Sequence, residues 1–195
     1  MERKYAWHNY DDATMEKVYA LSDTYRQFLD NGKTERECVV QAVEFAEAKG
    51  YVNLNDVIKS NTPIKAGDKI YYIHMDKSIA LFNIGTDDIE LGMNILGAHI
   101  DSPRIDVKQN PQYEDSNLVF WDTHYYGGIK KYHWVAMPLA IHGVVVKTDG
   151  TRININIGDK ETDPVFCITD LLPHLGQEQM QKNAAKVIEG EALDL

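Results

Sequence analysis

Residues 93–103 read Met-Asn-Ile-Leu-Gly-Ala-His-Ile-Asp-Ser-Pro, and this stretch decides the fold class that we predict. A short apolar run that contains a glycine is typical of a buried strand rather than of a helix. The run stops at a Ser-Pro pair, which favours a turn. His99 and Asp101 stand two residues apart, and alternate residues of a strand share a face. We therefore expect both side chains at the carboxyl end of a strand, pointing into a cleft.

Two amphipathic helices are predicted before this run. Asp11-Asp12 marks a helix start, and apolar residues then recur at helical spacing until Asn31-Gly32 supplies a stop. Thr34 and Glu37 match a capping box for a second helix that ends at Lys49-Gly50. Both apolar stripes are interpreted as core. Their members are Met15, Val18, Leu21, Tyr25, Phe28 and Leu29 in the first helix, and Val39, Ala42, Val43, Phe45 and Ala46 in the second.

Strand patterns dominate the rest of the chain, so the predicted fold class is α/β. The predicted strands are 69–75, 78–84, 93–100, 118–123, 139–146 and 152–157. Asp149-Gly150 favours a tight hairpin turn between the last two. Residues 109–117 are polar and turn-rich, which indicates a domain boundary, and 176–187 predict a short polar helix. Residues 190–195 carry apolar side chains but no predicted element.

The composition is that of a globular protein and excludes several classes of function. The chain has 195 residues, of which 44% are hydrophobic and 26% charged, and its net charge is −10. An acidic balance disfavours nucleic acids and anionic membrane surfaces as partners. No segment approaches the ~20 apolar residues of a membrane helix, and no signal peptide is visible. Because Cys38 and Cys167 stand far apart and alone, we expect a reduced, cytoplasmic location.

The pair His99 and Asp101 is the candidate for metal chemistry. Imidazole nitrogen is a good ligand for zinc, and a neighbouring carboxylate can orient the ring. The alternative is a histidine that merely hydrogen-bonds at a strand end. Spacing alone favours this alternative, because a His-x-Asp pair is common.

Longer tracts decide between the two. Residues 97–108 contain a His-x-Asp-Ser-Pro signature, Tyr126-Gly127-Gly128 follows, and Leu139–Gly143 leads into a valine-rich strand. Residues 168–175 end in a His-Leu pair. With these tracts in this order, the sequence resembles the aspartyl aminopeptidase and aminopeptidase I family of zinc metallopeptidases, peptidase family M18. One departure concerns residues 132–139, where family members carry two acids and an arginine that are absent here, so the preferred substrate residue stays open.

The resemblance implies an α/β/α catalytic domain interrupted by a β-rich dimerisation domain. Residues 1–108 would begin the former and 109–195 would form the latter, incompletely. His99 would be a ligand of one of two metal ions, zinc or alternatively cobalt or manganese, and Asp101 the catalytic carboxylate that supports it. His174 would reach the active site of a partner subunit; its alternative reading is an ordinary surface or interface histidine.

The implied activity is hydrolysis of N-terminal residues from peptide substrates. Family enzymes are more than twice as long as this chain, and their remaining metal ligands and glutamate base follow the dimerisation domain. A two-metal site needs roughly six or more ligand atoms. The sequence is therefore interpreted as the amino-terminal part of an aminopeptidase, inactive alone. The alternative is a non-catalytic assembly module or peptide-binding module with the same fold.

Self-association is also implied, as a dimer or a higher assembly, since the family forms dodecamers. The segment from Asn117 onward is rich in large apolar residues, which are favoured at the centre of interfaces. They could equally fill the core of the segment itself. They are Tyr125, Tyr126, Ile129, Tyr132, Trp134, Met137, Phe166 and Leu171.

Overall fold

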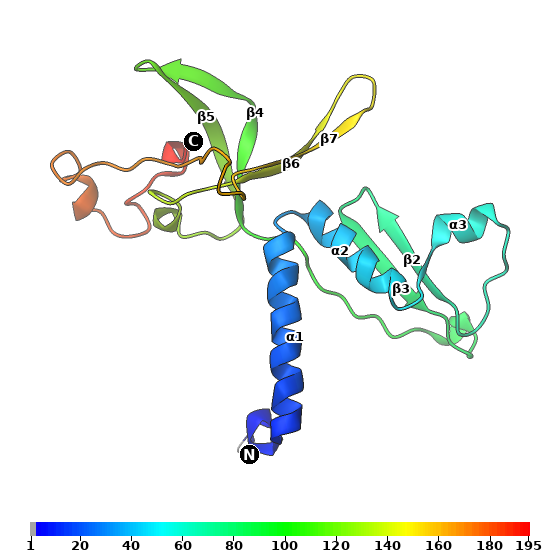
Figure 1. Cartoon of the computed structure of the whole chain (residues 1–195). Coiled ribbons are helices and arrows are strands. Elements are labelled where there is room, and N and C mark those ends of the chain that lie inside the picture. The colour runs from blue at the N-terminus through cyan, green and yellow to red at the C-terminus, as the bar shows by residue number, and fades with distance from the viewer. Residues whose placement is uncertain (1–2) are drawn as a thin grey trace. The chain divides into compact units, whose positions relative to one another are not determined.

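Both predicted helices begin at the residues whose side chains cap them. The computed structural model describes residues 3–195, and helix α1 spans Asp12–Asn31 (Figure 1). The Asp11 carboxylate accepts a hydrogen bond from the Thr14 amide at 2.9 Å. Hydrogen bonds from Thr14 hold the pKa of Asp11 below its usual value. An acidic residue at this position satisfies one of the amides that a helix start leaves without a partner.

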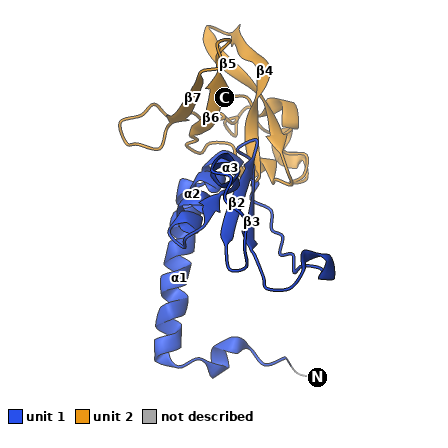
Figure 2. Ribbon diagram, turned by 90° about the vertical axis from the view of Figure 1, so that its right-hand side faces the viewer, with its two compact units in different colours: residues 1–101 blue, residues 102–195 orange. Residues whose placement is uncertain are grey.

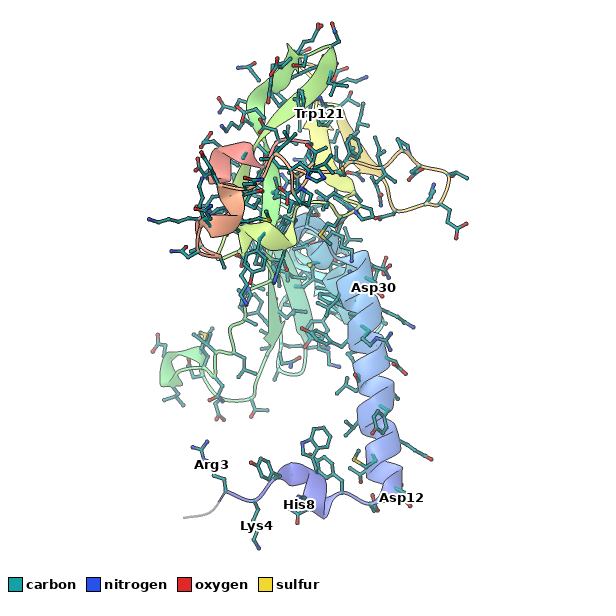
Figure 3. All side chains as sticks on the ribbon, turned by 90° about the vertical axis from the view of Figure 1, so that its left-hand side faces the viewer. Arg3, Lys4, His8, Asp12, Asp30 and Trp121 are labelled. Atoms are coloured by element: carbon teal, nitrogen blue, oxygen red, sulfur yellow. The ribbon has the colours of Figure 1, made fainter. Side chains whose placement is uncertain are left out.

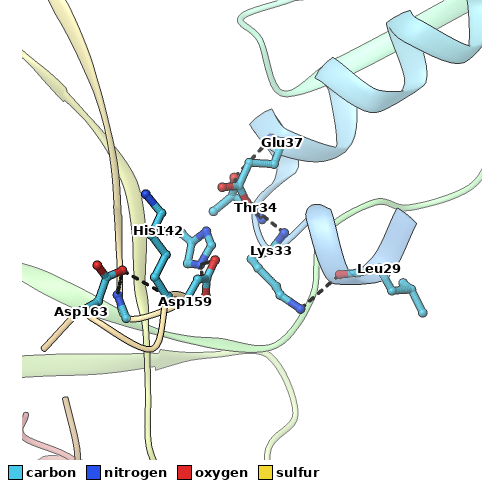
Figure 4. A network of polar contacts seen from close by, with 9 residues as sticks. Leu29, Lys33, Thr34, Glu37, His142, Asp159 and Asp163 are labelled. Atoms are coloured by element: carbon cyan, nitrogen blue, oxygen red, sulfur yellow. Dashed lines mark hydrogen bonds and ion pairs between the residues drawn. The ribbon is translucent and has the colours of Figure 1, made fainter. Parts of the chain in front are cut away.

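Helix α2, Glu35–Glu47, begins with the predicted capping box (Figure 4). The Glu37 amide donates to Thr34 Oγ1 at 3.3 Å, and the Thr34 amide donates to the Glu37 carboxylate at 2.9 Å. Lys33 Nζ adds a hydrogen bond to the Leu29 carbonyl oxygen at 3.3 Å. These contacts fix the turn between the two helices, as the sequence predicts.

Helix α2 packs against a three-stranded sheet. Its strands are β1 (Val52–Asn53), β2 (Lys69–His74) and β3 (Ser78–Asn83), with β1 parallel to β2 and β2 antiparallel to β3. The predicted strands at 69–75 and 78–84 are confirmed. Strand β1 and helix α3 (Leu54–Lys59) are too short to show a periodicity, so the sequence does not predict them. The buried core here is Cys38, Val39, Ala46, Ile70 and Tyr71.

The apolar stripe of α1 is not core, and that interpretation is wrong. The helix buries none of its residues, and Leu21 is 71% exposed. Its last turn does contact α2, because the Phe28 and Phe45 rings lie 6.3 Å apart and Gln41 Nε2 donates to the Phe28 carbonyl oxygen at 3.0 Å. Figure 3 shows side chains projecting from α1 between Asp12 and Asp30. An amphipathic pattern shows which face is apolar, but not that another element covers it.

The predicted strand at 93–100 is also wrong. These residues are extended but belong to no strand, and Leu96 is 99% exposed. Within the described chain, no neighbouring strand pairs with this run. A strand requires a partner for its backbone amides and carbonyls, so an apolar run of strand-forming residues stays irregular when no partner is beside it.

The chain divides into two compact units, residues 1–101 and residues 102–195 (Figure 2). The predicted boundary at 108/109 rests on the polar segment 109–117. Most of that segment is instead strand, because β4 spans Arg104–Asp115. Its side chains are mostly exposed, so their polarity reflects a solvated strand face rather than a linker. The assignment of 1–108 and 109–195 to catalytic and dimerisation domains stays a prediction.

Two antiparallel hairpins form the second unit. Strand β4 pairs with β5 (Leu118–Tyr126), with an irregularity in register between Val107 and Gln112. Strand β6 (Ile141–Val146) pairs with β7 (Arg152–Ile157), and Gly150 makes the turn with φ +84°. The three strands and the turn that the sequence predicts here are confirmed.

The chain from 176 to 187 is not the predicted helix. It forms turns, with one 3₁₀ turn at Gln179–Gln181. A short polar segment has too small an apolar face to hold a helix against the unit. Other 3₁₀ turns lie at Ala6–Asn9, Ile89–Leu91, Lys131–His133 and Gly190–Ala192.

Residues 190–195 pack into the core of the second unit, although the sequence predicts no element there. Leu193 is 0% exposed and shares a buried cluster with Ile168 and Ile188. The buried Thr123 hydroxyl donates to the Leu193 carbonyl oxygen. Trp121 and Leu195 exchange two backbone hydrogen bonds, of 2.9 and 3.1 Å, as antiparallel strand neighbours do.

Side chains reinforce this closure. The Tyr113 hydroxyl donates to Asp194 Oδ2 at 2.6 Å, and this bond raises the pKa of Tyr113 to about 12. Lys108 Nζ forms ion pairs with Asp122 at 2.8 Å and with Glu191 at 3.1 Å. The hairpin β4–β5 and the end segment are thus joined by backbone, apolar and charged contacts together.

Within residues 3–195, no helix combines the length and the apolar character that crossing a bilayer requires.

Candidate metal site and relatives

His99 and Asp101 lie in direct contact at the end of the first unit. The Nδ1 atom of His99 is 3.0 Å from the Asp101 carbonyl oxygen and 3.2 Å from Asp101 Oδ1. The His99 side chain is 84% exposed and that of Asp101 39%. The expectation that the two side chains lie together is confirmed, but residues 99–101 belong to no strand, so the contact does not come from a strand face.

This contact suits a metal ligand. In the tautomer that carries its proton on Nδ1, the ring donates to Asp101 and keeps the lone pair of Nε2 available. Histidine ligands of metals usually donate their other ring N–H to a carboxylate or a carbonyl in this way. Zinc accepts imidazole nitrogen readily. The donor chemistry of the pair therefore fits one protein ligand of a zinc ion.

One ligand does not make a site. Among residues 3–195, no three His, Cys, Asp or Glu side chains are arranged to hold a metal ion. The cleft expected beside the pair stays a prediction: a hollow of about 680 Å³ in the first unit is lined by residues of α3 and β2, including Val57 and Ile70, and by neither His99 nor Asp101. The chain itself thus offers one exposed imidazole in contact with a carboxylate.

His174 lies in the second unit, on a turn beside exposed Leu172 and Leu175. Its own side chain is exposed. An exposed position is compatible with contact to a partner subunit and equally with an ordinary surface histidine, so its catalytic role stays a prediction.

Three other histidines have structural contacts. His142 Nε2 lies 3.1 Å from Asp159 Oδ2 (Figure 4). The His124 ring stacks on Tyr125 at 5.6 Å, and the His133 ring packs edge-on against Tyr132 at 4.6 Å. Sequence reasoning passed over Arg104, whose guanidinium carbon lies 4.0 Å from the centre of the Tyr126 ring on the paired strand. A cation opposite an aromatic residue on a paired strand was the signal available.

The model of the family described as aminopeptidase I zinc metalloprotease (M18) matches residues 28–193. The chain belongs to the M18 family. The resemblance to M18 that the His-x-Asp-Ser-Pro and Tyr-Gly-Gly tracts indicate is therefore confirmed. The family's description supports zinc as the metal.

Named M18 relatives are similar over all or most of the chain. The probable M18 family aminopeptidase 1 of Clostridium acetobutylicum is 52% identical over 194 residues, which is 100% of this chain and 42% of the relative. That of Thermotoga maritima is 47% identical over 182 residues, covering 91% of this chain and 38% of the relative. The chain thus spans about two fifths of the length of these M18 relatives.

Solved M18 structures share the fold. An M18 aminopeptidase from Thermotoga maritima matches with a TM-score of 0.88 at 44% identity, over 100% of this chain and 41% of that one. Aminopeptidase I from Clostridium acetobutylicum matches with a TM-score of 0.83 at 52% identity, over 98% of this chain and 42% of that one. The predicted α/β fold class is confirmed. The mApe1 dodecamer of Saccharomyces cerevisiae has the same fold, with a TM-score of 0.62 at 20% identity, over 77% of this chain and 36% of that one.

Proposed function

We propose that this chain is part of a zinc-dependent aminopeptidase that removes N-terminal residues from peptides. The observation that carries the proposal is the His99–Asp101 contact, in which Nδ1 lies 3.2 Å from a carboxylate oxygen inside the matched M18 region. A carboxylate that contacts the second ring nitrogen of a histidine is the usual arrangement around a histidine that binds zinc, and Asp101 contacts His99 in this way.

Each residue of the pair has a separate role. His99 binds a metal ion through Nε2, and Asp101 fixes the ring by accepting from Nδ1. Zinc bound in such a site lowers the pKa of a bound water and polarises the peptide carbonyl. We propose a second ion in the complete site, and cobalt or manganese as alternatives to zinc. We propose that the other ligands and the general base lie in the part of the M18 relatives that this chain does not span, since the chain covers 42% of the Clostridium acetobutylicum relative and its described residues supply no cluster of three.

This proposal predicts that the 195-residue chain is inactive alone. With zinc, cobalt or manganese added, we expect no release of amino acids from unblocked peptides or aminoacyl chromogens, and no tight binding of two zinc ions by metal analysis. If the 195-residue chain does turn over substrate, and His99→Ala abolishes that turnover, the chain already holds a complete site.

The positive arm uses a completed enzyme. We define this as the chain followed by the remaining length of an M18 aminopeptidase, taken from the gene's own downstream sequence or from the Clostridium acetobutylicum relative. We expect zinc-dependent aminopeptidase activity from it. If a folded, zinc-loaded protein shows no aminopeptidase activity, the alternative of a non-catalytic assembly module or peptide-binding module is favoured instead.

We propose further that the second unit self-associates, as a dimer or more. Of the predicted interface residues, Ile129 and Trp134 pack against the unit's own core, whereas Met137 is 43% and Leu171 55% exposed. The exposed members are the ones that a second copy could cover. Light scattering of the completed enzyme tests this, and a monomeric mass would contradict it.

His174→Ala in the completed enzyme tests the reach of one subunit into its partner. We expect assembly to persist while kcat falls by about 10²–10³, the usual effect of losing a donor to a transition-state oxyanion. Initial rates and the light-scattering mass are measured on the same sample. Unchanged kcat would identify His174 as a surface histidine.

A reduced, cytoplasmic location is part of the same proposal. Both cysteines are free, with Cys38 buried and Cys167 exposed, and free thiols are common in that compartment.

A further inference from the structure

A second hollow, of about 320 Å³, lies within the second unit. Three of the residues that line it are lysines, Lys131, Lys182 and Lys186, and Glu189 is its one acidic lining residue. This balance is the reverse of that of the whole chain, which has a net charge of −10. We propose that the hollow binds a phosphate group, either as inorganic phosphate or as part of a small phosphate monoester.

The ammonium group of Lys131 is held at the hollow by neighbours that do not cancel its charge. Lys131 Nζ lies 5.6 Å from the centre of the Tyr125 ring and donates to the Ala185 carbonyl oxygen at 3.5 Å. The same ring supports the adjoining wall, because a β-carbon at Gly190 would lie 2.9 Å from Tyr125 Cε1, closer than two such atoms approach. A ring face and a carbonyl oxygen orient the ammonium group, but neither carries a full negative charge.

The other two lysines differ in their contacts. Lys182 Nζ forms an ion pair with Glu189 Oε1 at 3.1 Å. The structure gives the Lys186 ammonium group no hydrogen bond and no ion pair with any of residues 3–195. Glu189 therefore offsets one of the three positive charges around the hollow, and two remain. Like charges around one hollow repel each other, and a bound anion removes this repulsion.

The chemistry of the lining favours phosphate over a carboxylate. An ammonium group is a point charge with three donors, so lysines from separate parts of the chain can each approach a different phosphate oxygen. A carboxylate is matched better by the planar fork of arginine, and no arginine lines this hollow. Phosphate carries a charge of about −1.5 to −2 at pH 7, which is close to the charge that Glu189 leaves uncompensated.

The volume also restricts the ligand. Pockets for small molecules usually measure ~300–1,000 Å³, and this hollow lies at the lower end of that range. A phosphate group with a few further atoms is therefore expected rather than a large molecule.

The binding test titrates the 195-residue chain with inorganic phosphate at pH 7 and needs neither zinc nor turnover. Sodium chloride keeps the ionic strength constant, because salt screens diffuse attraction between charges. We expect saturable shifts of the amide NMR signals of Ala185, Lys186 and Gly190, with a Kd of about 1 mM or lower. Shifts that do not saturate, or that are equally large at lysines outside the hollow, would overturn the proposal.

Two single substitutions are expected to change the affinity in opposite directions. Lys186→Met removes an ammonium group that has no partner in the structure, so folding is retained and the Kd for phosphate should rise about tenfold or more. Glu189→Gln removes the competing negative charge and should lower the Kd about two- to fivefold. Lys160→Met is the matched control, since it changes the net charge equally at an exposed residue outside the hollow. An equal loss of affinity in Lys160→Met and Lys186→Met would indicate unspecific attraction and overturn the site.

Two further ligands identify the source of the phosphate group. If the ligand is a monoester, glycerol 3-phosphate should bind more tightly than inorganic phosphate, because its carbon atoms can contact the uncharged lining of Ala185, Ile188 and Gly190. If the ligand is free phosphate, inorganic phosphate should bind at least as tightly as the ester. Succinate supplies two carboxylates in place of the phosphate, and binding of succinate as tight as that of phosphate would overturn the assignment.

Discussion

Replacing His99 by alanine in the completed enzyme is expected to abolish release of N-terminal amino acids. Loss of a partner that merely orients a metal ligand typically costs 10–100-fold in metal affinity or activity, so loss of the ligand itself should cost about 10³ or more in kcat/KM. The physical reason is that the exposed ring presents Nε2 as a donor, and alanine has none. Initial rates on an aminoacyl chromogen and zinc content after dialysis measure both effects.

Two variants make this experiment specific. Asp101→Asn keeps an oxygen acceptor near Nδ1, and the Asp101 carbonyl contact at 3.0 Å is retained, so we expect a loss of only about 10–100-fold. His124→Ala removes a histidine that stacks on Tyr125 and should keep zinc and near-normal rates. Full zinc content and normal turnover in His99→Ala would show that His99 is not a ligand.

Replacing Leu193 by alanine is expected to destabilise the second unit by about 2–5 kcal/mol, the range for a fully buried leucine. Leu193 is 0% exposed, and its removal would leave a cavity beside Ile168 and Ile188. Urea unfolding of the chain, followed by tryptophan fluorescence, measures the loss, because Trp121 pairs with the same end segment.

A matched control distinguishes burial from residue type. Leu118→Ala removes the same atoms from a leucine that is 61% exposed in β5, and surface substitutions usually change stability by within about 0.5 kcal/mol. Equal effects of Leu193→Ala and Leu118→Ala would contradict the assignment of residues 190–195 to the core.

Local features were predictable because a few neighbouring residues determine them. The caps at Asp11 and Thr34 involve partners three residues away, and the sequence shows both members. The alternation in 152–157 and the turn at Gly150 likewise define a hairpin without reference to the rest of the chain. The contact of His99 with Asp101 belongs to the same class, since the two residues are two apart.

The features that the sequence did not predict depend on contacts between residues that are distant in sequence. The run 93–100 has the composition of a buried strand, yet it is unpaired in the described chain. The segment 190–195, for which the sequence predicts no element, exchanges backbone hydrogen bonds with β5 through Leu195 and buries Leu193. Composition shows how much burial of apolar side chains would stabilise a segment. It does not show which other segment supplies the partner backbone and the covering atoms. The sequence by itself therefore determined the starts of α1 and α2, the hairpins β2–β3 and β6–β7, and the family. Only the tertiary structure decided which apolar surfaces are covered, because burial and strand pairing are interactions between residues far apart along the chain.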